Sequence, residues 1–280
     1  MSVVELTVLL GAASLVAGFL GALTGLGGGV VIVPLLTLAF GVDIRYAIGA
    51  SLVSVIATSS GAAAAYVKEG FSNIRIGMFL EVATSTGALL GAFLAGVLST
   101  HVIGIIFGAV LLYSAFQSLH PPVAAPCDDK QRDRLATLLK LHGSFPGECG
   151  KQREYCVQCV PMGFGLMFGA GALSGLLGIG SGALKVIALD RIMRIPFKVS
   201  TTTSNFMIGV TAAASAGIYL NRGYIDPAVA MPVMLGVSLG ALLGSRFLVV
   251  THARLLRFVF AGVILFLGAE VIYSSIMGRL

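Results

Sequence analysis

Small residues interrupt apolar segments at two places in this sequence, and these breaks are the best candidates for chemistry. Glycine in a helix interior costs about 1 kcal/mol relative to alanine, so each cluster is expected to end a helix. Lipid offers no partner to the freed backbone groups, so such a break persists only where it lines a cavity. Exposed N–H groups and the positive end of a following half-helix favour an anion. Tight packing between helices is the alternative. The residues assigned to an anion site are Gly27, Gly28, Gly29, Gly180, Ser181 and Gly182.

Polar side chains that suit the same anion follow each break. Ser51, Ser204 and Asn205 can hydrogen-bond a small anion, although a helix cap or a bond between helices would use the same groups. Lys185 lies in an apolar run directly after the second break. A lysine inside a membrane is a functional-site hypothesis by default, so we assign it to substrate binding. Snorkelling to the surface and pairing with Asp190 are the alternatives.

Two acidic residues, Glu81 and Glu270, lie within long apolar segments. Burial raises the pKa of a carboxyl group toward neutrality, so either residue could carry a proton that is coupled to transport. A solvated position near a helix end is the other interpretation of each.

All four cysteines fall in one polar stretch between the apolar blocks, at Cys127, Cys149, Cys156 and Cys159. Four thiolates that include a Cys-x-x-Cys pair can hold zinc or an iron–sulfur cluster, so they form a candidate metal site. A redox-active thiol pair and inert free thiols remain as alternatives. Transport itself requires no cofactor on this interpretation.

The composition places these residues in a membrane protein. Of the 280 residues, 57% are hydrophobic and 11% are charged, whereas a soluble domain carries about 25% charged residues. The net charge of +6 comes from loops, as the positive-inside rule requires, so the expected partners are the lipid bilayer and a small anion, not nucleic acid. The sequence does not determine the oligomeric state.

The apolar segments form two blocks, residues 1–118 and 161–280, on either side of a linker at 119–160. Each block has about five segments. Because spanning a bilayer takes about 20 residues, the segments that follow the breaks, 28–41 and 183–190, are short enough to be half-helices.

The two blocks are repeats that align without a gap at an offset of 153 residues. Gly29 falls on Gly182 and Ser51 falls on Ser204, while Gly87-Ala-Leu-Leu-Gly91 is identical to the segment from Gly240. Chance does not explain one ungapped register of this length.

The distribution of lysine and arginine predicts how the repeats are oriented. If the chain crosses the membrane straight through each break, 10 basic residues lie on one side and 7 on the other. If it turns back at each break, the division is 14 to 3, which obeys the positive-inside rule far better. We therefore predict an all-α integral membrane protein of two inverted-topology repeats, each opened by a glycine-broken helical hairpin. The linker is then cytoplasmic and both termini lie outside the cell membrane.

The sequence resembles the TauE/SafE family of sulfite exporters. The resemblance rests on Gly25-Leu-Gly-Gly-Gly29 followed by Pro34, on Gly49-Ala-Ser-Leu52, and on the weaker second copy. It implies a permease that moves sulfite or sulfonates.

Inverted repeats with interrupted helices are typical of secondary transporters, so we expect export of a small sulfur-containing anion by alternating access and no enzymatic activity. The alternatives are an importer or channel for another anion or sulfur compound such as thiosulfate, and a membrane thiol or redox protein that uses the linker cysteines.

Overall fold

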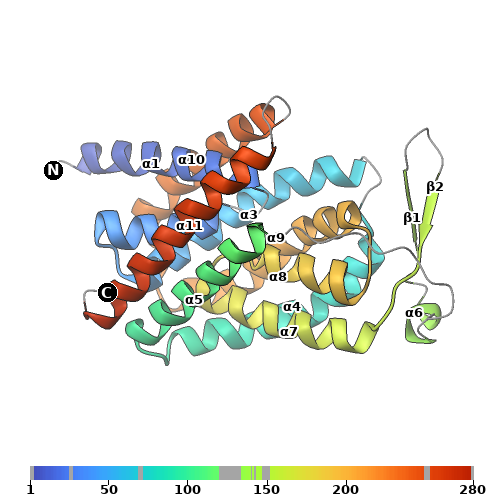
Figure 1. Ribbon diagram of the computed structural model, residues 1–280. Coiled ribbons are helices and arrows are strands. Elements are labelled where there is room, and N and C mark those ends of the chain that lie inside the picture. The colour runs from blue at the N-terminus through green and yellow to red at the C-terminus, as the bar shows by residue number, and fades with distance from the viewer. Residues whose placement is uncertain are drawn as a thin grey trace.

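The computed structural model describes residues 3–24, 28–68, 72–119, 134–139, 141, 143–146, 152–248 and 253–278, and they are mostly helical (Figure 1). The first block contains α1 (Val3–Thr24), α2 (Gly29–Pro34) with the π-helix η1 (Leu35–Ala39), α3 (Ile44–Lys68), α4 (Ile74–Ala95) and α5 (Thr100–Leu119). The second contains α7 (Val160–Leu177), α8 (Gly182–Ile187) with the π-helix η4 (Ala188–Ile192), α9 (Phe197–Asn221), α10 (Pro227–Leu248) and α11 (Ala253–Ile276).

The sequence repeat is also a repeat of secondary structure. The bounds of α2, η1, α3 and α4 coincide with those of α8, η4, α9 and α10 after the 153-residue shift. Among the described residues, α4 and α7 are long and apolar enough to cross a bilayer by length and composition alone.

The chain turns back on itself at the second break. The backbone N–H of Gln158, just before α7, donates to the carbonyl of Met193, just after η4, at 3.1 Å. The start of α7 and the end of η4 therefore lie together, and α7 and α8–η4 form a hairpin. In the first block, α1 and α2 likewise pack against each other.

The first helix of each block packs against the fourth helix of the other block, α1 against α10 and α7 against α4. Small residues allow this close approach. A side chain at Gly18 would overlap the backbone of Val237, and a side chain at the equivalent Gly171 would overlap the backbone of Thr84. The glycines of α4 have the same packing role, since Gly87 and Gly91 lie against backbone of α7.

The remaining long helices pair with their own equivalents, α3 with α9 and α5 with α11. Both pairs run antiparallel. Gly49, near the start of α3, meets the carbonyl of Tyr224, which follows the end of α9. The N–H of Asn73, which follows α3, donates to Thr203 Oγ1 in the second turn of α9 at 3.1 Å. His101, at the start of α5, contacts the carbonyl of Ser275 near the end of α11 at 3.0 Å.

The linker departs from the all-α expectation because it contains a β-hairpin. It comprises α6 (Arg134–Leu138) and the antiparallel strands β1 (Gly143–Pro146) and β2 (Gln152–Tyr155). These elements lie at the end of the bundle away from the start of α1 and the end of α11 (Figure 1).

Asn73 attaches the linker to the helices. Its Nδ2 donates to Tyr155 Oη at 2.6 Å and to the Leu141 carbonyl at 3.4 Å, and its Oδ1 caps α4 by accepting from the Ile76 N–H at 3.1 Å. Burial raises the pKa of Tyr155, with a smaller opposing effect from the Asn73 hydrogen bond, so its hydroxyl stays protonated at neutral pH.

Candidate transport site

The two glycine breaks meet, although they come from different blocks. Ser51 Oγ, on α3, donates to the carbonyl of Gly178 in the second break at 2.8 Å. A Cβ added to Gly29 in the first break would lie 2.7 Å from the same Ser51 Oγ and 3.0 Å from the Gly178 carbonyl oxygen. Gly178 and Gly180 have φ values of +67° and +70°, a conformation that glycine adopts at little cost. Ser51 therefore connects the breaks.

An equivalent serine supports the second break. Ser204 Oγ, on α9, donates to the carbonyl of Gly182 at 3.3 Å. Asn205 follows it and is half-buried. None of these side chains caps the start of α9, which begins at Phe197 after Pro196, and Ser200 Oγ in its first turn donates to the Ile195 carbonyl.

Ser181 is an unusual residue within the second break. It is 4% exposed, its backbone has φ +44°, and its Oγ has no hydrogen-bond partner among the described residues. A non-glycine residue with positive φ is uncommon, and strained residues of this kind cluster at ligand sites. The buried hydroxyl of Ser181 is therefore available for a hydrogen bond.

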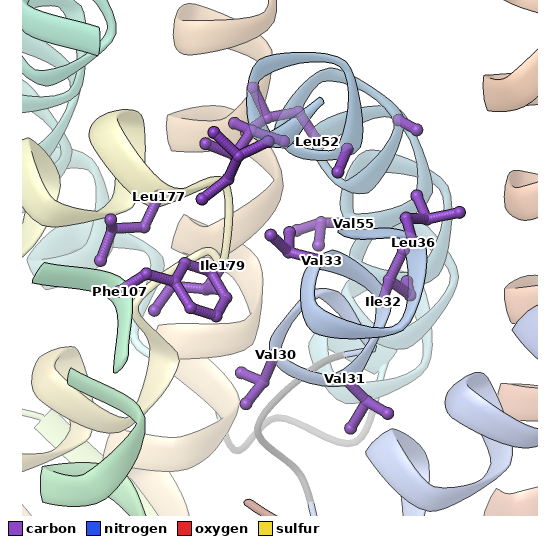
Figure 2. Packing of buried hydrophobic residues seen from close by; sticks show 14 of the residues in the cluster. Val30, Val31, Ile32, Val33, Leu36, Leu52, Val55, Phe107, Leu177 and Ile179 are labelled. Carbon is purple, nitrogen blue, oxygen red and sulfur yellow. The ribbon is translucent and has the colours of Figure 1, made fainter. Parts of the chain in front are cut away.

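Apolar side chains surround the breaks. Val55 lies close to both of them, because added Cβ atoms would stand 2.9 Å from it at Gly29 and 3.3 Å from it at Gly180. Figure 2 shows Val55 within a cluster that also includes Val33 of α2 and Ile179 of the second break. In such surroundings few polar groups are available to bind an ion, so each has a large electrostatic effect.

A buried charged network lies beside the second break. Lys185 is 0% exposed, and its Nζ donates to Thr211 Oγ1 at 2.6 Å. Thr211 Oγ1 donates in turn to Glu81 Oε1 at 2.8 Å, which also accepts from Ser85 Oγ at 2.8 Å. Glu81 Oε2 is buried and has no hydrogen-bond partner within the described part of the chain. The carboxylate of α4 therefore balances the ammonium of α8 through a hydroxyl of α9.

The structure brings together most of the residues assigned from sequence. Gly28, Gly29, Ser51, Gly180, Ser181, Gly182, Lys185 and Ser204 all lie buried around the paired breaks. Lys185 contacts Thr211, so the alternative of snorkelling to the surface is wrong for a side chain that is 0% exposed. Glu270 is half-buried on α11, which packs mainly against α5 and also contacts α2 and α1. Gly27 lies outside the described residues.

The structure describes two of the four cysteines. Cys156 is half-buried, and Cys159 is exposed directly before α7. Cys127 and Cys149 lie outside the described residues. Among the residues that are described, no group of three His, Cys, Asp or Glu side chains could hold a metal ion. The four-thiolate site therefore stays a prediction.

Sequence reasoning missed Thr211 and Ser85, which join Lys185 to Glu81. One signal was present. At the repeat offset Lys185 falls on Ile32 and Glu81 falls on Met234, so both charges interrupt the repeat in the same way. Two isolated charges without repeat partners suggest that they compensate each other.

A helical bundle with two interrupted hairpins and a buried charged network belongs to the class of membrane transport proteins. The sequence profile of the family described as sulfite exporter TauE/SafE matches residues 10–271. The chain belongs to that family, and it is a membrane transporter and not an enzyme.

Bacterial relatives agree with this class. The chain is 27% identical to the probable membrane transporter protein YunE of Bacillus subtilis, over 99% of both chains. It is also 27% identical to a probable membrane transporter protein of Xylella fastidiosa, over 98% of both chains. The probable membrane transporter protein YdhB of Bacillus subtilis is 26% identical over 83% of this chain and 85% of its own length. The comparison with solved structures gave no significant match.

Proposed function

We propose that this chain exports a small sulfur-containing anion, either sulfite or an organosulfonate, by alternating access. One observation carries the proposal: the two breaks, from different blocks, meet through the Ser51–Gly178 hydrogen bond. Interrupted helices at equivalent places of two repeats are where secondary transporters bind substrate. Membership of a family described as sulfite exporters favours the sulfur oxyanion.

The anion is held by backbone N–H groups of the breaks and by short hydroxyls. Gly28 and Gly29 supply the first break, and Gly180 and Gly182 the second, with Ser181 Oγ as a free donor. Ser51 and Ser204 exchange their carbonyl partners for the anion, and Asn205 adds an amide. Lys185 supplies the positive charge that an anion needs in an apolar site.

The repeats have inverted topology, the linker is cytoplasmic, and both termini lie outside. Support comes from the antiparallel pairing of α3 with α9 and of α5 with α11. The positions of two arginines agree with this topology. Arg45 bonds the Leu98 carbonyl and Arg222 the Ala92 carbonyl, at the end of the bundle opposite the linker, where few basic residues are expected.

The test is counterflow of labelled anions in proteoliposomes that contain the purified full chain. The panel is sulfite, methanesulfonate and thiosulfate, with chloride as the comparison. We expect sulfite or methanesulfonate to exchange faster than in protein-free liposomes. The Lys185→Met variant should abolish this exchange. The matched control is Gly217→Ala, at a position where an added Cβ meets no other group within 4 Å.

Three results separate the alternatives. Exchange of none of the anions by folded protein would overturn the proposal. Exchange of thiosulfate alone would favour the alternative of an importer or channel for that compound. Normal exchange by Lys185→Met would remove Lys185 from the site.

A further inference from the structure

The hydroxyl of Thr211 has more partners than it can serve at once. It accepts from Lys185 Nζ at 2.6 Å, and it lies 2.8 Å from Glu81 Oε1 and 2.8 Å from the Met207 carbonyl oxygen. A threonine hydroxyl carries a single hydrogen, so it donates to either the carboxylate or the carbonyl, not to both. Thr211 can therefore change acceptor without moving.

We propose that Glu81, Thr211 and Lys185 couple the anion to a proton, so that one proton and one monovalent anion cross the membrane together, outward whenever the outward anion gradient exceeds the opposing proton gradient. This inference rests on the proposed function, because it assigns the coupling ion of the same site. It selects Glu81 over Glu270 as the coupling residue.

With Glu81 ionised, the site has no net charge in the absence of substrate. The Glu81 carboxylate balances the Lys185 ammonium through Thr211. An anion that entered would place a second negative charge beside the carboxylate, and like charges in a buried site repel strongly. The ionised state therefore excludes the anion.

Protonation of Glu81 reverses this preference. The carboxylate takes a proton from water at Oε2, the oxygen without a hydrogen-bond partner among the described residues. The bond from Ser85 to Oε1 is preserved, and the Thr211 hydrogen turns to the Met207 carbonyl. Lys185 then holds a buried charge without compensation, which is costly, and a bound anion removes that cost. The added proton and anion sum to zero charge.

No other charged group is placed to replace Glu81 on the neighbouring elements. On α4 itself Arg75 is exposed near the first turn. Helix α7 has no ionisable side chain. On α9 the ionisable side chains are Lys198, in its first turn and more than three turns from Thr211, and Tyr219, whose hydroxyl lies 3.2 Å from the carbonyl oxygens of Gly175 and Leu176. The charged residues of η4, Asp190 and Arg191, are half-buried and exposed.

The experiment measures anion accumulation in proteoliposomes with a pH gradient and no membrane potential. The probes are methanesulfonate, which remains a monoanion throughout, and sulfite. For the wild-type chain, one pH unit should drive about tenfold accumulation of methanesulfonate, because one proton accompanies each monoanion. A membrane potential alone should drive none, since the complex is neutral.

Matched variants locate the coupling. Glu81→Gln imitates the protonated acid, so it should exchange the anion but lose the response to the pH gradient. Glu270→Gln, the same change on α11, should keep the tenfold accumulation. Thr211→Val should weaken the coupling, whereas Thr58→Val, at the equivalent position of α3, should not.

The outcomes distinguish the two proposals. If the wild-type chain exchanges neither probe, the proposed function fails. If it exchanges a probe but Glu81→Gln still accumulates it with the pH gradient, the coupling inference fails and the transport function stands. If Glu81→Gln does not fold, the Thr211→Val and Thr58→Val pair decides: equal coupling in both would overturn the inference.

Discussion

The surroundings of the two breaks differ in chemistry although their backbones are equivalent. The second break has Lys185 with Thr211 and Glu81, whereas the first has Ile32, Thr58 and Met234 at the same three positions. Ile32 is 0% exposed, and within the described residues Thr58 Oγ1 bonds carbonyls of its own helix, Ser54 at 3.0 Å and Val55 at 3.3 Å. The first break therefore shows that uncharged side chains at these positions are sufficient for packing. The second break carries two charged side chains in addition.

The added charges come from opposite repeats. Lys185 lies on α8 of the second block, and Glu81 lies on α4 of the first. Any motion of one block relative to the other changes the distance between them. A charge pair within one block would not respond in this way.

The largest expected effect comes from removing one charge of the network. Lys185→Ile copies the residue of the first break but leaves Glu81 buried without its counter-charge, which should cost about 3–5 kcal/mol of stability. The double variant Lys185→Ile with Glu81→Met restores the complete apolar set and should recover most of that stability, but not transport. Thermal unfolding in detergent and anion counterflow measure the two effects. Equal destabilisation in the single and double variants would contradict the comparison.

A smaller effect is expected where the breaks touch. Gly29→Ala would place a Cβ 2.7 Å from Ser51 Oγ and 2.9 Å from Val55 Cγ2, so the breaks must separate. Overpacking of this kind costs about 1–3 kcal/mol, and we expect exchange to fall by about tenfold or more. Gly217→Ala adds the same atom in open space and should leave exchange unchanged. Full activity of Gly29→Ala would show that the breaks need not touch.

The helix caps next to the two halves offer a third comparison. Asn73 and its equivalent Asp226 both cap a helix, but only Asn73 also bonds the linker. Asn73→Ala should cost about 1–2 kcal/mol and increase cleavage of the linker by an added protease. Asp226→Ala should lose a cap of similar strength without exposing the linker. Equal protection of the linker in both variants would show that Asn73 does not hold it.

The smallest expected effect concerns Ser85, which donates to Glu81 at 2.8 Å. Ser85→Ala removes one of the two donors to Glu81 Oε1, so accumulation of the anion with a pH gradient should fall by about twofold or less. The equivalent change on α10, Ser238→Ala, faces no carboxylate at the matching position, where Met234 stands. Anion accumulation driven by one pH unit is measured for both variants, and equal accumulation would count against the role of Ser85.

Periodicity and glycine content predicted the helical elements because both depend on local sequence. The apolar segment after the first break was expected at 28–41, and α2 with η1 occupies Gly29–Ala39. The repeat predicted that equivalent residues such as Ser51 and Ser204 would hold similar positions. Each serine does lie beside a break.

The pairing of Lys185 with Glu81 could not be predicted from local sequence. The long helices α5 and α7 and the linker separate the two residues in the sequence, and their connection through Thr211 depends on how α4 of one block packs against α9 of the other. The β-hairpin of the linker was not predicted either, because its strands of four residues each are too short to show a clear alternation of apolar and polar residues. Contacts between blocks require the tertiary arrangement.

Each block packs its first helix against the other block, and this arrangement limits the order in which the protein can fold. The small-residue face of α1 is covered by α10, the next-to-last long helix, and α4 meets its partner α7 only after the linker. Neither block can complete its own packing, so neither is an independent folding unit. During synthesis the glycines of α1 therefore remain in contact with lipid until α10 has been inserted, when nearly the whole chain is complete.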